Sequence, residues 1–320
     1  MEMNPQGSVP RNKKRDATIP GEPGQTPRGF VQTVAEDAKV KNEAPKSLGL
    51  GGLLKKQRQL LANLGSLDSV IVALSGGADS AYLAWAAYRA LGKRALAVTA
   101  LSESFSAHDR EQTELFLRAA HVSHEFVKTR ELDDPRYRAN DADRCYYCKQ
   151  ELFRALQHMA QARGFAALAY GLNADDPGDF RPGQRAAGEH RVLTPLLDAG
   201  LHKAEIRVLS RHARLPTWDR PTSACLSSRV AYGIPVTPEI LRRIEQAEEA
   251  VRQLGFRQFR VRAHNDLARI EIAPEEMGRA LTPEMAGALA RSAREAGFVY
   301  VTLDLQGYRS GSLNDALVKP

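Results

Sequence analysis

A glycine pair flanked by hydroxyl groups and a carboxylate is the part of the sequence that most clearly predicts chemistry. It directly follows the apolar run 70–74, and its glycine and polar residues are Ser75, Gly76, Gly77, Asp79 and Ser80. Glycines without a Cβ let the backbone approach an anion, and the serine hydroxyls and the free N–H groups of a following helix are donors. We therefore predict a phosphate site at which the aspartate holds Mg²⁺. An ordinary strand-to-helix turn is the alternative.

A second polar loop, Tyr170-Gly-Leu-Asn-Ala-Asp-Asp176, follows another apolar run. The carboxyl ends of parallel strands face one crevice, so we expect this loop to reach the ligand of the first loop. Its candidate nucleotide or Mg²⁺ ligands are Gly171, Asn173, Asp175 and Asp176. The same residues are equally suited to an ordinary turn.

The three cysteines form a candidate metal or sulfur site. Cys145 and Cys148 are three residues apart at the start of a predicted helix, so their sulfurs share one face. Cys225 lies in a polar loop between arginines, whose charge is expected to lower the thiol pKa. Three thiolates suit an iron–sulfur cluster with one iron open to an extra sulfide. One alternative is a buried apolar stripe of free cysteines, and another is zinc, whose fourth-ligand candidates are His121, His124 and His264.

Two arginines near the C-terminus are spaced for anion binding. Arg260 and Arg262 alternate with apolar residues, so both side chains point to the same side of a predicted strand. Paired guanidinium groups suit a phosphate or a carboxylate, and a solvated strand face is the alternative.

The elements that position these residues alternate between short apolar runs and helical patterns, which predicts an α/β fold with a parallel sheet. The predicted strands are 70–74, 95–101, 124–128 and 166–170, and the helices are 79–91, 109–120, 143–163 and 203–214. After the loop 217–235 the order changes to helix 238–254, strands 259–262 and 268–272, helix 274–296 and strand 299–303. This order predicts a smaller C-terminal α+β domain.

Composition limits the remaining possibilities. The Pro, Gly and charged residues of 1–48 predict a disordered tail, followed by domains at 49–221 and 222–320. With 45 Lys and Arg against 38 Asp and Glu, the net charge of +7 is too modest to indicate a nucleic-acid binder. Three cysteines, no signal peptide and no uninterrupted apolar span indicate a cytoplasmic protein.

The SGGxDS motif at 75–80 resembles the signature of the N-type ATP pyrophosphatase, or PP-loop, superfamily. Its members adenylate a carbonyl or carboxylate and release pyrophosphate, and nitrogen or sulfur then attacks the adenylate. The resemblance implies an adenine nucleotide alpha hydrolase-like fold that binds ATP and Mg²⁺ at this loop. Neither a GxxxxGK[ST] loop nor a GxGxxG turn occurs in the sequence.

Together with GLNADD and TSACLSSR, the motif is similar to the LarE-type sulfur transferases of nickel-pincer nucleotide cofactor biosynthesis, over about 53–314. Some members use the cysteine matching Cys225 as a sacrificial sulfur donor. The pair Cys145 and Cys148 is similar instead to the subtype in which three cysteines hold a 4Fe-4S cluster. The resemblance implies adenylation and sulfur transfer on a pyridinium-3,5-dicarboxylate mononucleotide. The catalytic residues that it implies are Cys225, Asp79, Arg260, Arg262 and Glu271, and the substrate-binding residues are Arg229, Arg260, Arg262 and Arg269.

Three other functions remain open at this point. A tRNA thiolase can pair the same loop with cysteines, but the sequence has no stripe of basic residues interleaved with aromatics. An NAD- or GMP-synthetase-like ligase would use ammonia and leave all three cysteines idle. A non-catalytic adenine-nucleotide-binding module is the third. We expect a homo-oligomer whose partners are a carboxylate-bearing nucleotide and sulfide or another sulfur donor, without nucleic acid or membrane.

Overall fold

The computed structural model describes residues 49–176, 182–221 and 224–317, which belong to one compact unit. The predicted disordered tail at 1–48 lies outside these residues. The predicted boundary between 221 and 222 touches the undescribed pair 222–223 and stays a prediction.

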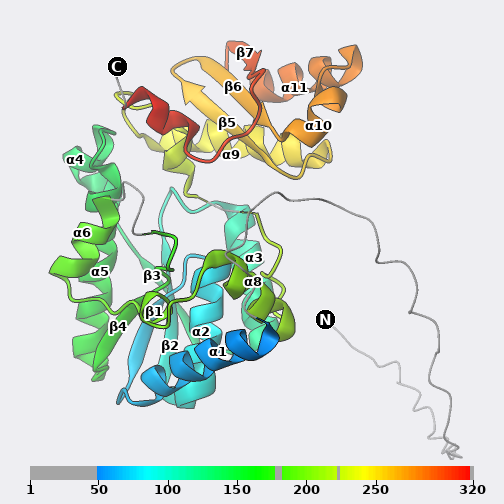
Figure 1. Cartoon of the computed structure of the whole chain (residues 1–320). Coiled ribbons are helices and arrows are strands. Elements are labelled where there is room, and N and C mark those ends of the chain that lie inside the picture. Colours follow the sequence, from blue (N-terminus) through cyan, green and yellow to red (C-terminus); the bar gives the residue numbers. More distant parts are fainter. Residues whose placement is uncertain (1–48, 177–181, 222–223, 318–320) are drawn as a thin grey trace, which may run out of the picture. The chain divides into compact units, whose positions relative to one another are not determined.

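A parallel four-stranded sheet forms the larger half of the described chain (Figure 1). Its strands are β1 (Val70–Ala73), β2 (Ala95–Leu101), β3 (His124–Lys128) and β4 (Ala167–Tyr170). They are ordered β3-β2-β1-β4, so the chain moves outward from β1 and then returns to add β4 on the other side. This confirms the predicted α/β fold.

Helices cover both faces of this sheet. The connecting helices are α2 (Ala78–Leu91), α3 (Ala107–Ala120), α4 (Pro135–Arg138), α5 (Arg144–Arg163), α6 (Pro182–Glu189), α7 (Pro195–Asp198) and α8 (Lys203–His212). Short 3-10 turns are η1 (Gly92–Arg94), η2 (Glu131–Asp133), η4 (Leu226–Arg229) and η5 (Ser312–Ala316).

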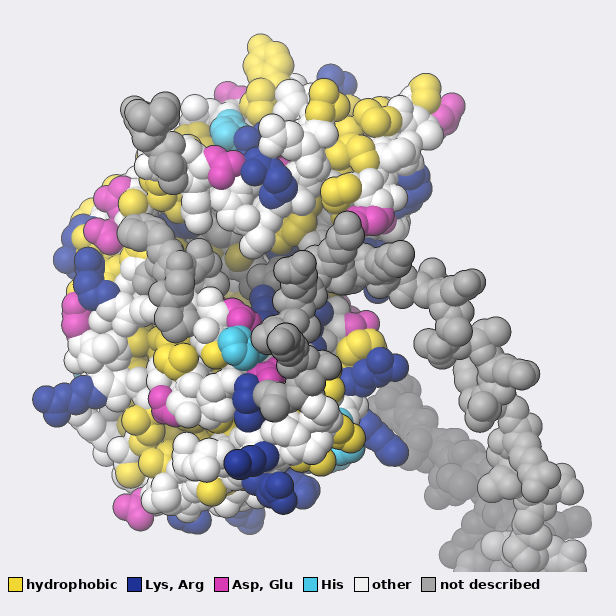
Figure 2. All heavy atoms as spheres, viewed as in Figure 1, with side chains coloured by type: hydrophobic (Ala, Val, Ile, Leu, Met, Phe, Trp, Pro, Cys, Tyr) yellow, Lys and Arg dark blue, Asp and Glu magenta, His cyan; other side chains and the backbone are white. Residues whose placement is uncertain are grey.

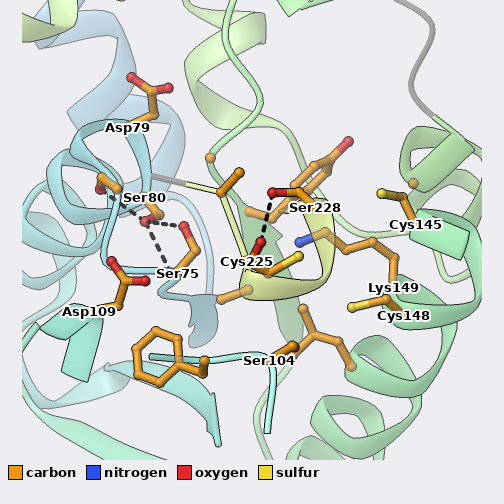
Figure 3. Close-up of a pocket in the computed structure, with 18 of the residues that line it drawn as sticks. Ser75, Asp79, Ser80, Ser104, Asp109, Cys145, Cys148, Lys149, Cys225 and Ser228 are labelled. Carbon is orange, nitrogen blue, oxygen red and sulfur yellow. Dashed lines mark hydrogen bonds between the residues drawn. The ribbon is translucent and has the colours of Figure 1, made fainter. Parts of the chain in front are cut away.

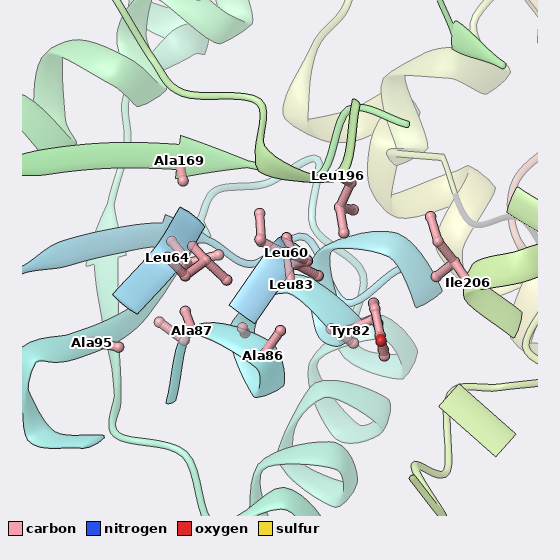
Figure 4. Packing of buried hydrophobic residues seen from close by; sticks show 14 of the residues in the cluster. Leu60, Leu64, Tyr82, Leu83, Ala86, Ala87, Ala95, Ala169, Leu196 and Ile206 are labelled. Atoms are coloured by element: carbon pink, nitrogen blue, oxygen red, sulfur yellow. The ribbon is translucent and has the colours of Figure 1, made fainter. Parts of the chain in front are cut away.

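One helix absent from the sequence prediction, α1 (Leu50–Gly65), packs against α2 (Figure 4). Leu60 and Leu64 of α1 are fully buried against the almost entirely buried Tyr82–Ala87 stretch of α2. Only Leu53, Leu60 and Leu64 of its 16 residues are buried, but six leucines recur in it at helical spacing, so its pattern is visible in the sequence. The helix forms because tertiary packing covers that narrow face.

A three-stranded sheet forms the smaller half. Strands β5 (Phe259–His264) and β6 (Leu267–Ile272) are antiparallel, and β7 (Tyr300–Leu303) adds parallel to β6. Helices α9 (Pro238–Gln253), α10 (Pro274–Ala280) and α11 (Pro283–Glu295) complete this half. The single helix predicted over 274–296 is wrong, because Thr282 accepts a hydrogen bond from Met285 N as an N-cap and Pro283 starts a new helix.

On the surface in Figure 2, Lys and Arg side chains are spread among polar and apolar ones, with several over the part that carries α1 and α8. The most exposed large apolar side chains of the described residues include Leu281, Val299, Tyr300 and Leu305 in the smaller half. Within the described ranges, no helix combines the length and the apolar character needed to cross a lipid bilayer.

Candidate active site

The phosphate loop, Ser75–Ser80, joins the end of β1 to the first turn of α2. Ser75 N donates to Ser80 Oγ at 3.1 Å, the two serine hydroxyls are 3.0 Å apart, and Ser80 Oγ donates to Gly77 O at 3.1 Å. These bonds close the loop on itself. The serine hydroxyls therefore hold its shape, and the backbone N–H groups at the start of α2 remain the natural donors to an anion.

Two glycines are required by close contacts around this loop. Gly76 has φ +77°, and a Cβ there would lie 2.5 Å from Thr113 Oγ1. A Cβ on Gly171, at the end of β4, would lie 2.8 Å from Ser80 N and 2.9 Å from Ser80 Cα. The end of β4 thus packs directly on the first turn of α2, so Gly171 shapes the phosphate site.

The second polar loop meets the first, as predicted from the parallel strands. Asn173 Nδ2 donates to Asp79 Oδ2 at 3.1 Å, and Asn173 N donates to Asp176 Oδ2 at 3.0 Å. Asp175 instead fixes the start of α8, because its carboxylate accepts from Lys203 N at 2.7 Å and lies 2.6 Å from His202 Nδ1.

Asp79 has the properties of a cation ligand. Its Oδ1 is buried and accepts no hydrogen bond from the described part of the chain. Burial raises the pKa of this carboxyl, which the charge of Lys203 and the bond from Asn173 oppose. A buried carboxylate oxygen left without a partner, with the Asp176 carboxylate nearby, fits a hard divalent cation such as Mg²⁺.

A pocket of 620 Å³ joins these loops to the cysteines and to the smaller half. It lies beside the carboxyl ends of β1 and β4, where the strand order reverses. The predicted site residues that line it are Ser75, Gly77, Asp79, Ser80, Gly171, Asp176, Cys145, Cys148, Cys225, Arg260 and Arg262. The predicted residues not among its lining are Gly76, Asn173, Asp175, Arg229, Arg269 and Glu271.

The three thiols line this one pocket from two segments (Figure 3). Cys145 and Cys148 lie on the first turns of α5, and Cys225 lies between them and the phosphate loop. The described residues contain no group of three or more His, Cys, Asp or Glu placed to hold one metal ion. In a 4Fe-4S cluster each thiolate binds a different iron, so the thiolates need not converge on one point. Three thiols around one cavity therefore fit such a cluster.

The expectation that the pKa of Cys225 is lowered overall is wrong, although the neighbouring Arg229 does act in that direction. Burial raises the pKa of this thiol and outweighs the opposing charges of Arg144 and Arg229. Burial likewise raises the pKa of Cys148 far above its ordinary value, and the Glu131 carboxylate adds to the effect. Without a bound cation, both thiols therefore favour the neutral form.

The cysteine loop, which we define as the described residues 220–221 and 224–229, is held at its C-terminal end by Arg229. The guanidinium of Arg229 forms a bidentate ion pair with Glu248 of α9, at 2.9 and 3.0 Å. It also donates to Ala224 O and, at 3.0 Å, to Cys225 O. Arg229 is buried, and these bonds use all three of its nitrogens. Its side chain therefore positions Cys225 and is not placed to touch a substrate.

The predicted arginine pair does lie on one side of β5. Arg260 and Arg262 both line the pocket, whereas Glu271 is fully buried behind them. Glu271 Oε2 accepts from Arg262 Nε at 3.1 Å and from Nη2 at 2.9 Å, while Oε1 accepts from Arg269 and Ser312. Glu271 thus fixes the guanidinium of Arg262, and Arg269 supports Glu271 from outside the pocket.

Several charged residues that were not predicted as site residues also line the pocket. They are Asp109, Glu131, Arg144, Lys149, Lys203, Arg207 and Arg220. In Figure 3 the ammonium of Lys149 extends toward Cys225. Arg144 and Lys149 each adjoin a cysteine in the sequence and Arg220 flanks the third, which is a usable signal, whereas the others reach the pocket through the fold alone.

A glycine-containing phosphate loop between the first strand and helix of a β3-β2-β1-β4 parallel sheet defines an α/β protein with a PP-loop domain.

No family model matches the chain. An uncharacterised protein from Synechocystis sp. is 42% identical over 267 residues, which cover 83% of this chain and 100% of that protein. The pyridinium-3,5-bisthiocarboxylic acid mononucleotide synthase of Lactiplantibacillus plantarum is 34% identical over 268 residues, covering 83% of this chain and 96% of that enzyme. An uncharacterised protein from Methanocaldococcus jannaschii is 28% identical over 171 residues, which cover 53% and 66% of the two chains. The chain belongs to the family of the pyridinium-3,5-bisthiocarboxylic acid mononucleotide synthase, the LarE family.

Proposed function

We propose that this protein is an ATP-dependent sulfur transferase that converts a carboxylate of pyridinium-3,5-dicarboxylate mononucleotide into a thiocarboxylate. The observation that carries the proposal is that one pocket is lined by the phosphate loop, three thiols and the pair Arg260 and Arg262. The bisthiocarboxylic acid named for the Lactiplantibacillus relative gives the substrate class.

In the first step, a carboxylate oxygen of the substrate attacks the α-phosphorus of ATP. The bond to the β-phosphate breaks, and pyrophosphate leaves with the electron pair. Backbone N–H groups at the start of α2 hold the phosphates, and Asp79 with Asp176 would hold Mg²⁺, which would neutralise their charge. Arg260 binds the carboxylates or phosphate of the substrate. Arg262, whose guanidinium nitrogens are bonded to Glu271, Ser228 O and Ser312, adds its charge at the pocket wall.

In the second step, hydrosulfide attacks the acyl carbon of the adenylate. A C–S bond forms, the C–O bond to AMP breaks, AMP leaves with the electron pair, and the proton of the hydrosulfide is released to solvent. A 4Fe-4S cluster held by Cys145, Cys148 and Cys225 would supply this sulfur at the pocket wall. Arg229 keeps Cys225 facing the pocket through the bonds to the loop carbonyls.

A sacrificial route is the alternative for the sulfur source. The Cys225 thiolate would attack the adenylate, and elimination across its Cα and Cβ would release the thiocarboxylate and leave dehydroalanine. The presence of two further pocket thiols, which this route leaves unused, favours the cluster.

The test is turnover by the full chain purified without oxygen. With the dicarboxylate mononucleotide, Mg²⁺, ATP and sulfide, we expect pyrophosphate in proportion to product, with sulfur replacing oxygen in the product mass. Iron and acid-labile sulfide are measured on the same sample. No pyrophosphate with this substrate would refute the proposal. One product per chain, with Cys225 lighter by one H₂S, would select the sacrificial route.

Two further expectations belong to this proposal. The division at 221/222 would separate a nucleotide-activating domain from a substrate-binding domain that also forms homo-oligomer contacts. Cytoplasmic location would suit a protein that depends on reduced thiols.

A further inference from the structure

A second buried arginine, Arg220, holds the other end of the cysteine loop, and the proposed reaction assigns it no role. Its side chain is only 9% exposed. One guanidinium nitrogen, Nη1, donates to Gly76 O of the phosphate loop, and Nη2 donates to Asp109 Oδ1 at 2.6 Å. Arg220 therefore joins the phosphate loop, the start of α3 and the cysteine loop.

The contact with Gly76 bears on anion binding. The Gly76 carbonyl belongs to the same peptide group as the Gly77 N–H, at the N-cap of α2. A guanidinium on the carbonyl oxygen polarises this peptide and makes its N–H a stronger donor. A Cβ at Gly76 would lie 3.3 Å from Arg220 Nη1, so the guanidinium packs closely on this glycine. Arg220 also lines the pocket, so it adds positive charge beside the phosphate loop.

The same residue fixes the cysteine loop. Arg220 O accepts from Arg207 Nη2 at 2.8 Å, and further along the loop Leu226 N donates to Ser104 O at 2.9 Å. The loop that carries Cys225 is therefore held between two buried arginine–carboxylate pairs, Arg220–Asp109 at one end and Arg229–Glu248 at the other. Of these two pairs, the first also contacts the phosphate loop.

We propose that Arg220 couples the two halves of the site, so that pyrophosphate or ATP phosphates on the phosphate loop order the cysteine loop around Cys225. An anion that draws the Gly77 N–H toward it strengthens the Gly76–Arg220 bond, and Arg220 is only five residues before Cys225 in the sequence. By linkage, ordering the cysteine loop tightens phosphate binding by the same factor. The inference rests on the proposed function only in placing a phosphate ligand at 75–80.

Hydrogen exchange of the full chain, with inorganic pyrophosphate and Mg²⁺ as the probe, tests the coupling. The N–H groups of Leu226, Ser228 and Val230 donate hydrogen bonds within or beside the cysteine loop, so they report its opening. In the wild type, saturating pyrophosphate should slow exchange at 75–80 and also slow exchange at 224–230 by about fivefold or more. In Arg220→Ala, protection at 75–80 should remain at saturation, while protection at 224–230 is lost.

Two further variants separate coupling from damage to the fold. Arg220→Lys keeps the charge but cannot span Gly76 O and Asp109 together, so it should also lose the distant protection. Arg211→Ala is the matched control, because Arg211 stacks on Trp218 at 4.8 Å in the same region and has no side-chain hydrogen bond to the described residues of either loop. This variant should behave as wild type.

The outcomes are distinguishable. Protection at 224–230 that persists in both Arg220 variants, or that is missing in the wild type while 75–80 is protected, overturns the coupling alone. Failure of pyrophosphate to protect 75–80 or to bind the wild type overturns the phosphate-loop assignment, and the coupling with it.

Discussion

Gly171→Ala tests whether the contact between β4 and α2 shapes the phosphate site. The added Cβ would meet Ser80 N at 2.8 Å, Ser80 Cα at 2.9 Å and Asp79 C at 3.1 Å. All three are backbone atoms, so no side chain can rotate away and the strand end or the helix start must shift. Overpacking of this kind lowers the free energy of unfolding by about 1–3 kcal/mol. The same shift moves Asp79 and the N–H groups of α2, so the rate of pyrophosphate release should fall by more than tenfold (about 1.4 kcal/mol).

Urea unfolding and pyrophosphate release at a temperature where both proteins are folded measure the two effects. Gly278→Ala is the matched control, because this glycine is inside α10 with nothing within 4 Å of its added Cβ. That change should leave activity unaltered and stabilise the protein by about 0.5–1 kcal/mol. Wild-type stability together with wild-type release in Gly171→Ala would refute the argument from close packing.

Four further changes have defined outcomes. Asp79→Asn should keep the fold and abolish pyrophosphate release, and normal turnover would contradict its role at Mg²⁺. Replacing any one of the three cysteines by Ala should remove iron and sulfur transfer while adenylation continues. The triple variant should be no worse than the worst single variant. Full activity of either α5 variant would show that Cys145 and Cys148 are only part of the apolar face of the helix. Glu248→Ala leaves the Arg229 charge buried without its partner and should lower the free energy of unfolding by about 3–5 kcal/mol in urea, whereas a loss below about 1 kcal/mol would show that the pair is unimportant. Burial lowers the pKa of His124 from 6.5 to about 4, so the stability that depends on its neutral form is present above pH 6.5 and is lost as the pH falls toward 4. His124→Gln should therefore flatten the pH dependence of the unfolding midpoint between these values. An unchanged curve would contradict this effect.

The parts of the fold that local sequence determines could be predicted. Strands β2 and β3 begin and end where the apolar runs predict, because short β-rich runs bounded by polar residues need no information from elsewhere. The break at Pro283 in the helix predicted over 274–296 was also visible locally, as a Thr-Pro pair typical of a helix start. Helix α1 is absent from the prediction although its leucines recur at the spacing of one helix face, and that face packs in the same core as α2.

The candidate site likewise has a part that the local sequence predicts and a part that it does not. The phosphate loop is contiguous, so its glycines and carboxylate were predicted from one short run of residues. The bidentate pair Arg229–Glu248 and the bond from Arg220 to Gly76 join positions far apart in the chain, and no local pattern indicates them. Burial explains the error over Cys225, since charge near a thiol can be counted in the sequence whereas desolvation cannot.

The way in which the cysteine loop is attached has a consequence for divergence within the family. Its described residues before η4, Pro221, Ala224 and Cys225, belong to none of the three apolar cores. A segment anchored at its ends and absent from the cores tolerates substitution without loss of the fold. Under the proposed function, exchange of this short segment together with positions 145 and 148 on α5 would change how sulfur is delivered and leave the phosphate loop unaltered. The same segment would then be the natural unit for grafting between relatives.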